Sequence, residues 1–146
     1  MHRDPVASRR VLVIDDDPDL IALLSDGLGL LGGYDVVVAR DGASGLDRVY
    51  EVRPDCVVVD VRMPGLNGYQ FVRALRGDPA TAQLPVVVLS ALIRDRDKLA
   101  GLLTGADAYL FKPVRIHDLL QTLQLAMDVS AGQRQMRQLQ LADENG

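Results

Sequence analysis

Short aliphatic runs alternate along most of the chain with longer segments of helical spacing. The runs are rich in valine and continuously apolar, a pattern typical of strands that are buried on both faces of a sheet. Five of them are predicted to be strands, at residues 11–14, 36–39, 56–59, 86–89 and 108–111. The chain therefore predicts a repeated β-α pattern, in which helices cover both sides of a parallel sheet.

The segments between these runs carry apolar residues three and four positions apart, as amphipathic helices do. Asp17 and Pro18 suit the N-cap and first position of the first helix, and Gly32-Gly33 suits its end. Five helices are predicted, near residues 18–31, 41–52, 68–76, 94–103 and from about 114 to 127. Right-handed crossovers leave few windings for such a chain, and the strand order 2-1-3-4-5 is a common one.

Polar residues that could form a site follow the first, third, fourth and fifth predicted strands. They are Asp15, Asp16 and Asp17 after the first, Asp60 after the third, Ser90 after the fourth and Lys112 after the fifth. Because the carboxyl ends of parallel strands share one edge of the sheet, these side chains are expected to converge. Asp17 is explained as a helix cap. The other three carboxylates form an oxygen cluster that a divalent cation such as Mg²⁺ would stabilise. Lys112 adds a second positive charge, so the pKa values of the cluster need not rise.

Composition narrows the class of protein. A chain of 146 residues that is 48% apolar suits one globular domain, and a net charge of −4 without a basic patch argues against nucleic-acid binding. No apolar run approaches the ~20 residues that span a bilayer, and the first ten residues lack the apolar stretch of a secretory signal. Cys56 is the only cysteine, so no internal disulfide can form and a reducing cytoplasm is the expected location.

The residues at the strand ends resemble those of the receiver domain of bacterial two-component response regulators, the CheY-like superfamily. The resemblance rests on Asp15-Asp16, on D-x-x-M-P-G-x-x-G beginning at Asp60, on Ser90-Ala91 and on Lys112-Pro113. It covers residues 9–128 and implies a doubly wound (βα)5 flavodoxin-like sandwich with a five-stranded parallel sheet in the order 2-1-3-4-5. Residues 1–8 are then a flexible N-terminus, and residues 129–146 a polar tail or linker that could be helical.

The resemblance also implies a chemistry for the site. Asp60 would accept a phosphoryl group from the phosphohistidine of a sensor histidine kinase or phosphotransfer protein. Asp16 and Asp60 would bind Mg²⁺ directly, Asp15 would contribute through water, and Arg62 would supply its backbone carbonyl. Lys112 would pair with a phosphoryl oxygen.

A conformational switch is implied as well. Ser90 would donate its hydroxyl to another phosphoryl oxygen and draw in the loop that follows, while Tyr109 turns inward. The face made by the fourth helix, the fifth strand and the fifth helix would be the output surface, which is often used for homodimers. The Lys112–Pro113 bond is expected to be cis.

Three positions depart from the common pattern of the family or vary within it. Asn67 stands where many relatives have aspartate, a change that a turn tolerates. Arg62 and Leu92, each two residues after a site residue, lie near the path of the water that would attack the phosphoryl group. We expect a bulky arginine and an apolar leucine there to hinder this water and to prolong the phosphorylated state.

Other interpretations remain open from sequence. Taken singly, Asp15, Asp16 and Asp60 could be cap and turn residues, Ser90 could bond to local backbone, and Tyr109 could be packing. Aspartate-based phosphatases share this topology, but their D-x-D-x-T/V motif does not match D-D-D-P, and no P-loop is present. A scaffold that binds partners without phosphorylation has no reason to keep the full acidic set. The prediction is a signalling switch rather than an enzyme, and the sequence does not decide between a stand-alone protein and part of a larger regulator.

Overall fold

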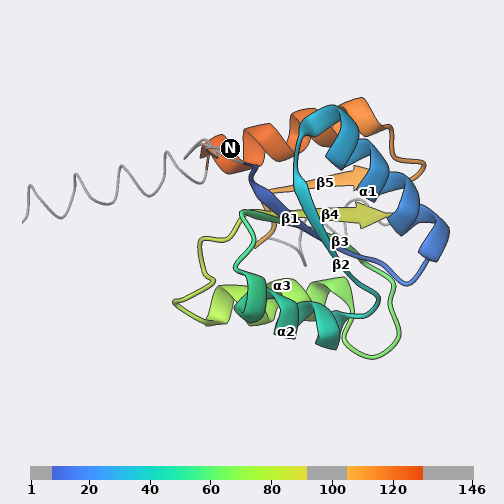
Figure 1. Ribbon diagram of the computed structural model, residues 1–146. Helices are drawn as coiled ribbons and strands as arrows, with labels where there is room; N and C mark the ends of the chain where they lie inside the picture. The colour runs from blue at the N-terminus through green and yellow to red at the C-terminus, as the bar shows by residue number, and fades with distance from the viewer. Residues whose placement is uncertain (1–7, 92–104, 130–146) are drawn as a thin grey trace, which may run out of the picture.

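Five parallel strands form one sheet in the computed structural model, which describes residues 8–91 and 105–129 (Figure 1). The strands are β1 (Arg10–Ile14), β2 (Asp35–Ala39), β3 (Cys56–Asp60), β4 (Val86–Ser90) and β5 (Ala108–Phe111). Their order is β2-β1-β3-β4-β5, as predicted. β3 and β4 each include one polar residue beyond the apolar run, because Asp60 pairs with Leu89 and Ser90 pairs with Phe111. Two site residues are therefore held by the sheet itself.

Helices cover both faces of this sheet. α1 (Pro18–Gly32) and a C-terminal helix of residues 116–129 lie on one face, and α2 (Gly42–Val52) and α3 (Gly68–Gly77) lie on the other (Figure 1). The predicted helix at 94–103 falls outside the described residues, as does Leu92. Within the described ranges, no helix combines the length and apolar character that a membrane crossing requires.

Side-chain caps begin three of the helices. Asp17 accepts hydrogen bonds from the backbone N–H groups of Asp19 and Leu20, which confirms its predicted role. Asp41 caps α2 in the same way. Asn67 does more than fill a turn: its side chain accepts from the backbone of Gln70, whose side chain accepts from the backbone of Asn67. This capping box fixes the point where the loop after β3 enters α3.

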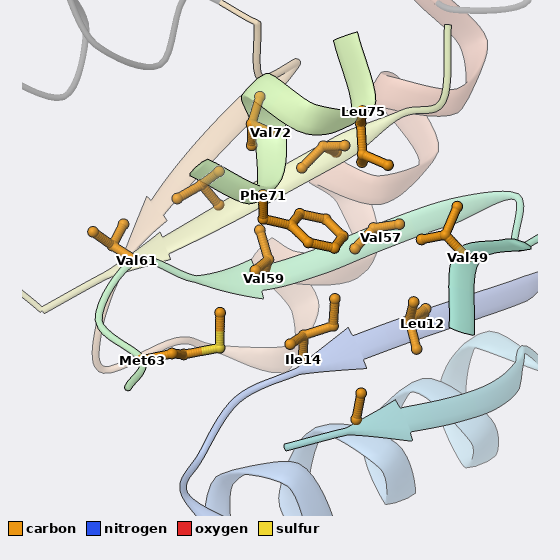
Figure 2. Packing of buried hydrophobic residues seen from close by; sticks show 13 residues of the cluster. Leu12, Ile14, Val49, Val57, Val59, Val61, Met63, Phe71, Val72 and Leu75 are labelled. Carbon is orange, nitrogen blue, oxygen red and sulfur yellow. The ribbon is translucent and has the colours of Figure 1, made fainter. Parts of the chain in front are cut away.

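The two faces of the sheet each bury an apolar cluster. Alternate residues of β1 serve opposite clusters, with Leu12 and Ile14 facing α2 and α3. Phe71 of α3 is fully buried in this cluster, and Figure 2 shows its ring beside Val57 and Val59 of β3. Because β3 is buried along its whole length, Asp60 lies at the end of a rigid strand.

Candidate functional site

Three carboxylates meet at the carboxyl ends of β1 and β3. Asp15 is 1% exposed and Asp60 is 5% exposed, whereas Asp16 is exposed to solvent. One oxygen from each of the three lies within 4.8 Å of the others. The structure therefore brings together the oxygen cluster that the strand-end residues predicted.

Asp15 is held more firmly than the sequence suggested. Its backbone N–H donates to the Ala39 carbonyl at 3.2 Å, which extends the β1–β2 pairing by one residue. One of its side-chain oxygens accepts from the Asp17 N–H at 2.9 Å, and the other accepts from the Lys112 ammonium at 3.2 Å. The direct contact between Asp15 and Lys112 was not anticipated, because the chain leaves β1 at Ile14 and the strand pattern does not say which of two adjacent acids turns inward.

Lys112 lies between two buried carboxylates. Its Nζ atom is 3.2 Å from Oδ2 of Asp15 and 3.3 Å from Oδ1 of Asp60. The Lys112–Pro113 peptide bond is cis, as predicted. The backbone N–H of Lys112 donates to the Ser90 carbonyl at 2.7 Å, which joins the ends of β4 and β5. Asp15, Asp60, Ser90 and Lys112 thus come from four strands to one edge of the sheet.

The charges of the site are not balanced. Burial, together with the neighbouring Asp15 carboxylate, raises the pKa of Asp60, and the Lys112 ammonium only partly opposes this. Without Mg²⁺, the Lys112 ammonium by itself does not keep the pKa of Asp60 from rising, because the Asp15 and Asp16 carboxylates also act on Asp60. Burial by itself would lower the pKa of Lys112, but the two carboxylates outweigh it and the pKa is raised. The site therefore favours a further positive charge.

The donor set fits Mg²⁺. All three clustered side chains offer hard oxygen ligands, and the exposure of Asp16 leaves room for the waters that Mg²⁺ retains. Arg62 lies two residues beyond Asp60 in the loop before α3, with its side chain exposed. The residues present are thus suited to the metal that the resemblance implied.

The two expected switch residues lie on neighbouring strands. Ser90 is 4% exposed at the end of β4. Tyr109 of β5 is half-buried against the cluster that faces α2 and α3, and its ring lies 5.9 Å from that of Phe111 at 77°. This packing is typical of an aromatic residue that contributes to the core. Movement of Ser90 or Tyr109 on phosphorylation stays a prediction.

Known proteins share both the sequence pattern and the fold. The family model described as "Response regulator receiver domain" matches residues 11–124. The chain is 47% identical over 115 residues to the transcriptional regulatory protein PrrA of Mycobacterium leprae, covering 79% of this chain and 48% of the relative. It is 41% identical over 113 residues to the DNA-binding response regulator MtrA of Mycolicibacterium smegmatis, covering 77% and 47%. The chain spans about half the length of the curated relatives it matches.

Solved structures with a similar fold include proteins of two-component signalling. A sensor protein from Polaromonas sp. JS666 superposes with a TM-score of 0.77 at 31% identity, over 84% of this chain and 98% of the other. The chemotaxis response regulator CheY4 of Vibrio cholerae superposes with a TM-score of 0.74 at 32% identity, over 82% and 99%. With the family model matching most of its length, the chain belongs to the family of response regulator receiver domains.

Proposed function

We propose that this receiver domain is a phosphorylation-dependent switch whose phosphoacceptor is Asp60. Membership of the family supports two-component signalling in general. The observation that carries the specific proposal is the position of Asp60, which is nearly buried yet lies 3.3 Å from the Lys112 ammonium and within the carboxylate cluster. A sensor histidine kinase or a phosphotransfer protein would be the partner that supplies the phosphoryl group.

The transfer uses Asp60 as the nucleophile. One of its carboxylate oxygens forms a bond to phosphorus while the phosphorus–nitrogen bond of the phosphohistidine breaks, and the imidazole leaves with the electron pair. Lys112, already beside Oδ1 of Asp60, is placed to pair with a phosphoryl oxygen. Asp16, Asp60 and the Arg62 carbonyl would hold Mg²⁺, with Asp15 acting through water. Bound Mg²⁺ would supply charge that offsets the negative charge of the transferring group.

The conformational change caused by phosphorylation would begin at the ends of β4 and β5. Ser90 donates its hydroxyl to a second phosphoryl oxygen, which draws the following loop inward and lets Tyr109 turn. The 2.7 Å hydrogen bond from the Lys112 N–H to the Ser90 carbonyl supports this, because the two residues that would contact the phosphoryl group already share a backbone link. The output face of residues 94–103, β5 and the C-terminal helix would then change its preference for a homodimer or another partner.

Acetyl phosphate tests the assignment of Asp60. We expect intact-mass measurements in the presence of Mg²⁺ to show a gain of one phosphoryl group that Asp60→Ala abolishes. Asp118→Ala, which removes an exposed carboxylate from the C-terminal helix, should leave the gain intact. Phosphorylation of Asp60→Ala would contradict the assignment. Steady turnover of acetyl phosphate without accumulation of phosphoprotein would favour an enzyme over the switch that we propose.

Arg62 is expected to slow hydrolysis of the phosphorylated protein. Arg62→Asn should raise the dephosphorylation rate severalfold, because a shorter side chain near Asp60 leaves more room for the attacking water. Loss of radiolabelled phosphate after removal of the donor measures this rate, with the exposed Arg48→Asn as the control. An unchanged rate in Arg62→Asn would show that this side chain does not shield the phosphoryl group.

A further inference from the structure

The loop of residues 61–67 packs closely against the end of β3 at the point where it enters α3. It connects Asp60 to α3 and carries Arg62, whose carbonyl is assigned to the metal. A Cβ atom added to Gly68 would lie 2.6 Å from the Asp60 carbonyl oxygen and 2.9 Å from the Val61 Cα atom. The Gly68 N–H also donates to the Val61 carbonyl at 3.0 Å. The end of the loop therefore folds directly back onto the end of β3.

A second close approach comes from α2. The buried residues of this helix are Gly42, Gly45 and Val49, so two of the three carry no side chain. A Cβ atom on Gly42 would overlap the carbonyl oxygen of Leu66 and lie 2.9 Å from the Leu66 Cβ atom. The first turn of α2 thus packs against the backbone of the loop, where no side-chain rotation can relieve an added atom.

The next turn of α2 packs closely against β1, which limits movement of the helix away from the loop. A Cβ atom on Gly45 would lie 2.9 Å from Cγ1 of Ile14, the last residue of β1. Asp41, at the N-cap, is bonded to the Ser44 backbone at 2.7 Å and holds the first turn in place. An atom added at Gly42 is therefore expected to displace the loop rather than the helix.

We propose that Gly42 is a positioning residue for the metal site. The missing Cβ lets α2 hold Leu66, and through Leu66 the loop that carries Arg62, in the place that metal binding requires. Gly42 is not among the residues assigned to the metal or to the phosphoryl group, and the atoms nearest to its missing Cβ belong to Leu66, so its effect would pass through the loop backbone. This inference rests on the proposed function of the site and adds to it a residue from a helix that contributes no ligand.

Isothermal titration calorimetry of the folded protein with MgCl₂ alone tests the proposal. Gly42→Ala should raise the dissociation constant for Mg²⁺ by about tenfold, the lower end of the range for residues that support metal ligands. Gly32→Ala is the matched control, because its Cβ atom would crowd the side chains of Leu120 and Tyr34 at the end of α1. The control should bind Mg²⁺ with the wild-type constant, and equal constants for Gly42→Ala and wild type would overturn the proposal.

A second variant covers the case in which Gly42→Ala does not fold. Leu66→Ala removes the half-buried side chain that packs the loop against the core, and it should also weaken Mg²⁺ binding. An unchanged constant in Leu66→Ala would then overturn the inference. Wild-type protein that binds no Mg²⁺ would instead contradict the proposed function, so the two failures are distinguishable. Circular dichroism and thermal unfolding confirm that each variant is folded at the temperature of the titration.

Discussion

Lys112→Met is expected to lower the free energy of unfolding of the Mg²⁺-free protein by about 3 kcal/mol, the lower end of the range for breaking a buried ion pair. The substitution keeps most of the side-chain volume but removes the ammonium between Asp15 and Asp60, which are 1% and 5% exposed. Two neighbouring buried carboxylates would then have no cation between them. Urea unfolding in the presence of EDTA measures the loss.

Mg²⁺ should recover much of this stability. At a hundredfold excess over its dissociation constant, a ligand that binds only the folded state stabilises it by about 2.7 kcal/mol. Lys112→Met should gain more than the wild type at the same Mg²⁺ concentration, because its uncompensated carboxylates bind the cation more tightly. Arg48→Met removes a cation from an exposed pair with Glu51 and should change stability by less than about 1 kcal/mol. Equal losses in the two variants would show that Lys112 is not compensating buried charge.

Arg76→Met is expected to lower the free energy of unfolding at neutral pH by about 1–3 kcal/mol, the range for leaving buried hydrogen-bond acceptors without a donor. The guanidinium donates to backbone carbonyl groups, of which Gly105 at 2.6 Å and Leu84 at 2.7 Å are the closest. It also pairs with Asp107 at 3.1 Å, and Asp107 in turn accepts from the Val86 N–H at 2.7 Å. One side chain thus connects the end of α3 to the start of β4 and to the segment that enters β5.

The stability loss in Arg76→Met should shrink at mildly acidic pH. Burial raises the pKa of Asp107, and the Arg76 cation opposes that rise. Without Arg76 the folded-state pKa of Asp107 rises further above its unfolded value, so stability falls as the pH rises through the folded-state pKa and returns on acidification. Urea unfolding at several pH values measures this, with Arg73→Met on the exposed side of α3 as the control. A loss that does not depend on pH would contradict the role given to Asp107.

The strand ends explain why much of the site could be predicted from sequence. Continuous valine runs identify parallel strands, and the first polar residue after each run falls at a shared edge of the sheet. Asp60, Ser90 and Lys112 were therefore placed together although they are far apart in the chain. The helix boundaries at Asp17 and Gly33 followed from local capping chemistry, which depends on few residues.

Features that depend on the approach of distant backbones could not be predicted. Arg76 near the end of a helix has the pattern of a solvated residue, and only the folding of the following loop brings carbonyl groups to it. The close approach of Gly42, at the start of α2, to Leu66 in the loop after β3 has no sequence signal. The rise in the pKa of Asp60 depends on how deeply the strand end is buried, which the order of residues does not give.

A crystal structure of the protein with Mg²⁺ and beryllofluoride, which mimics a phosphoryl group on aspartate, tests the central claim most directly. The account predicts beryllium bonded to a carboxylate oxygen of Asp60, with Mg²⁺ bound by Asp16, Asp60 and the Arg62 carbonyl. The Lys112 ammonium should contact a fluorine atom. A structure in which Asp60 carries no beryllofluoride and Lys112 points away from it would contradict the account.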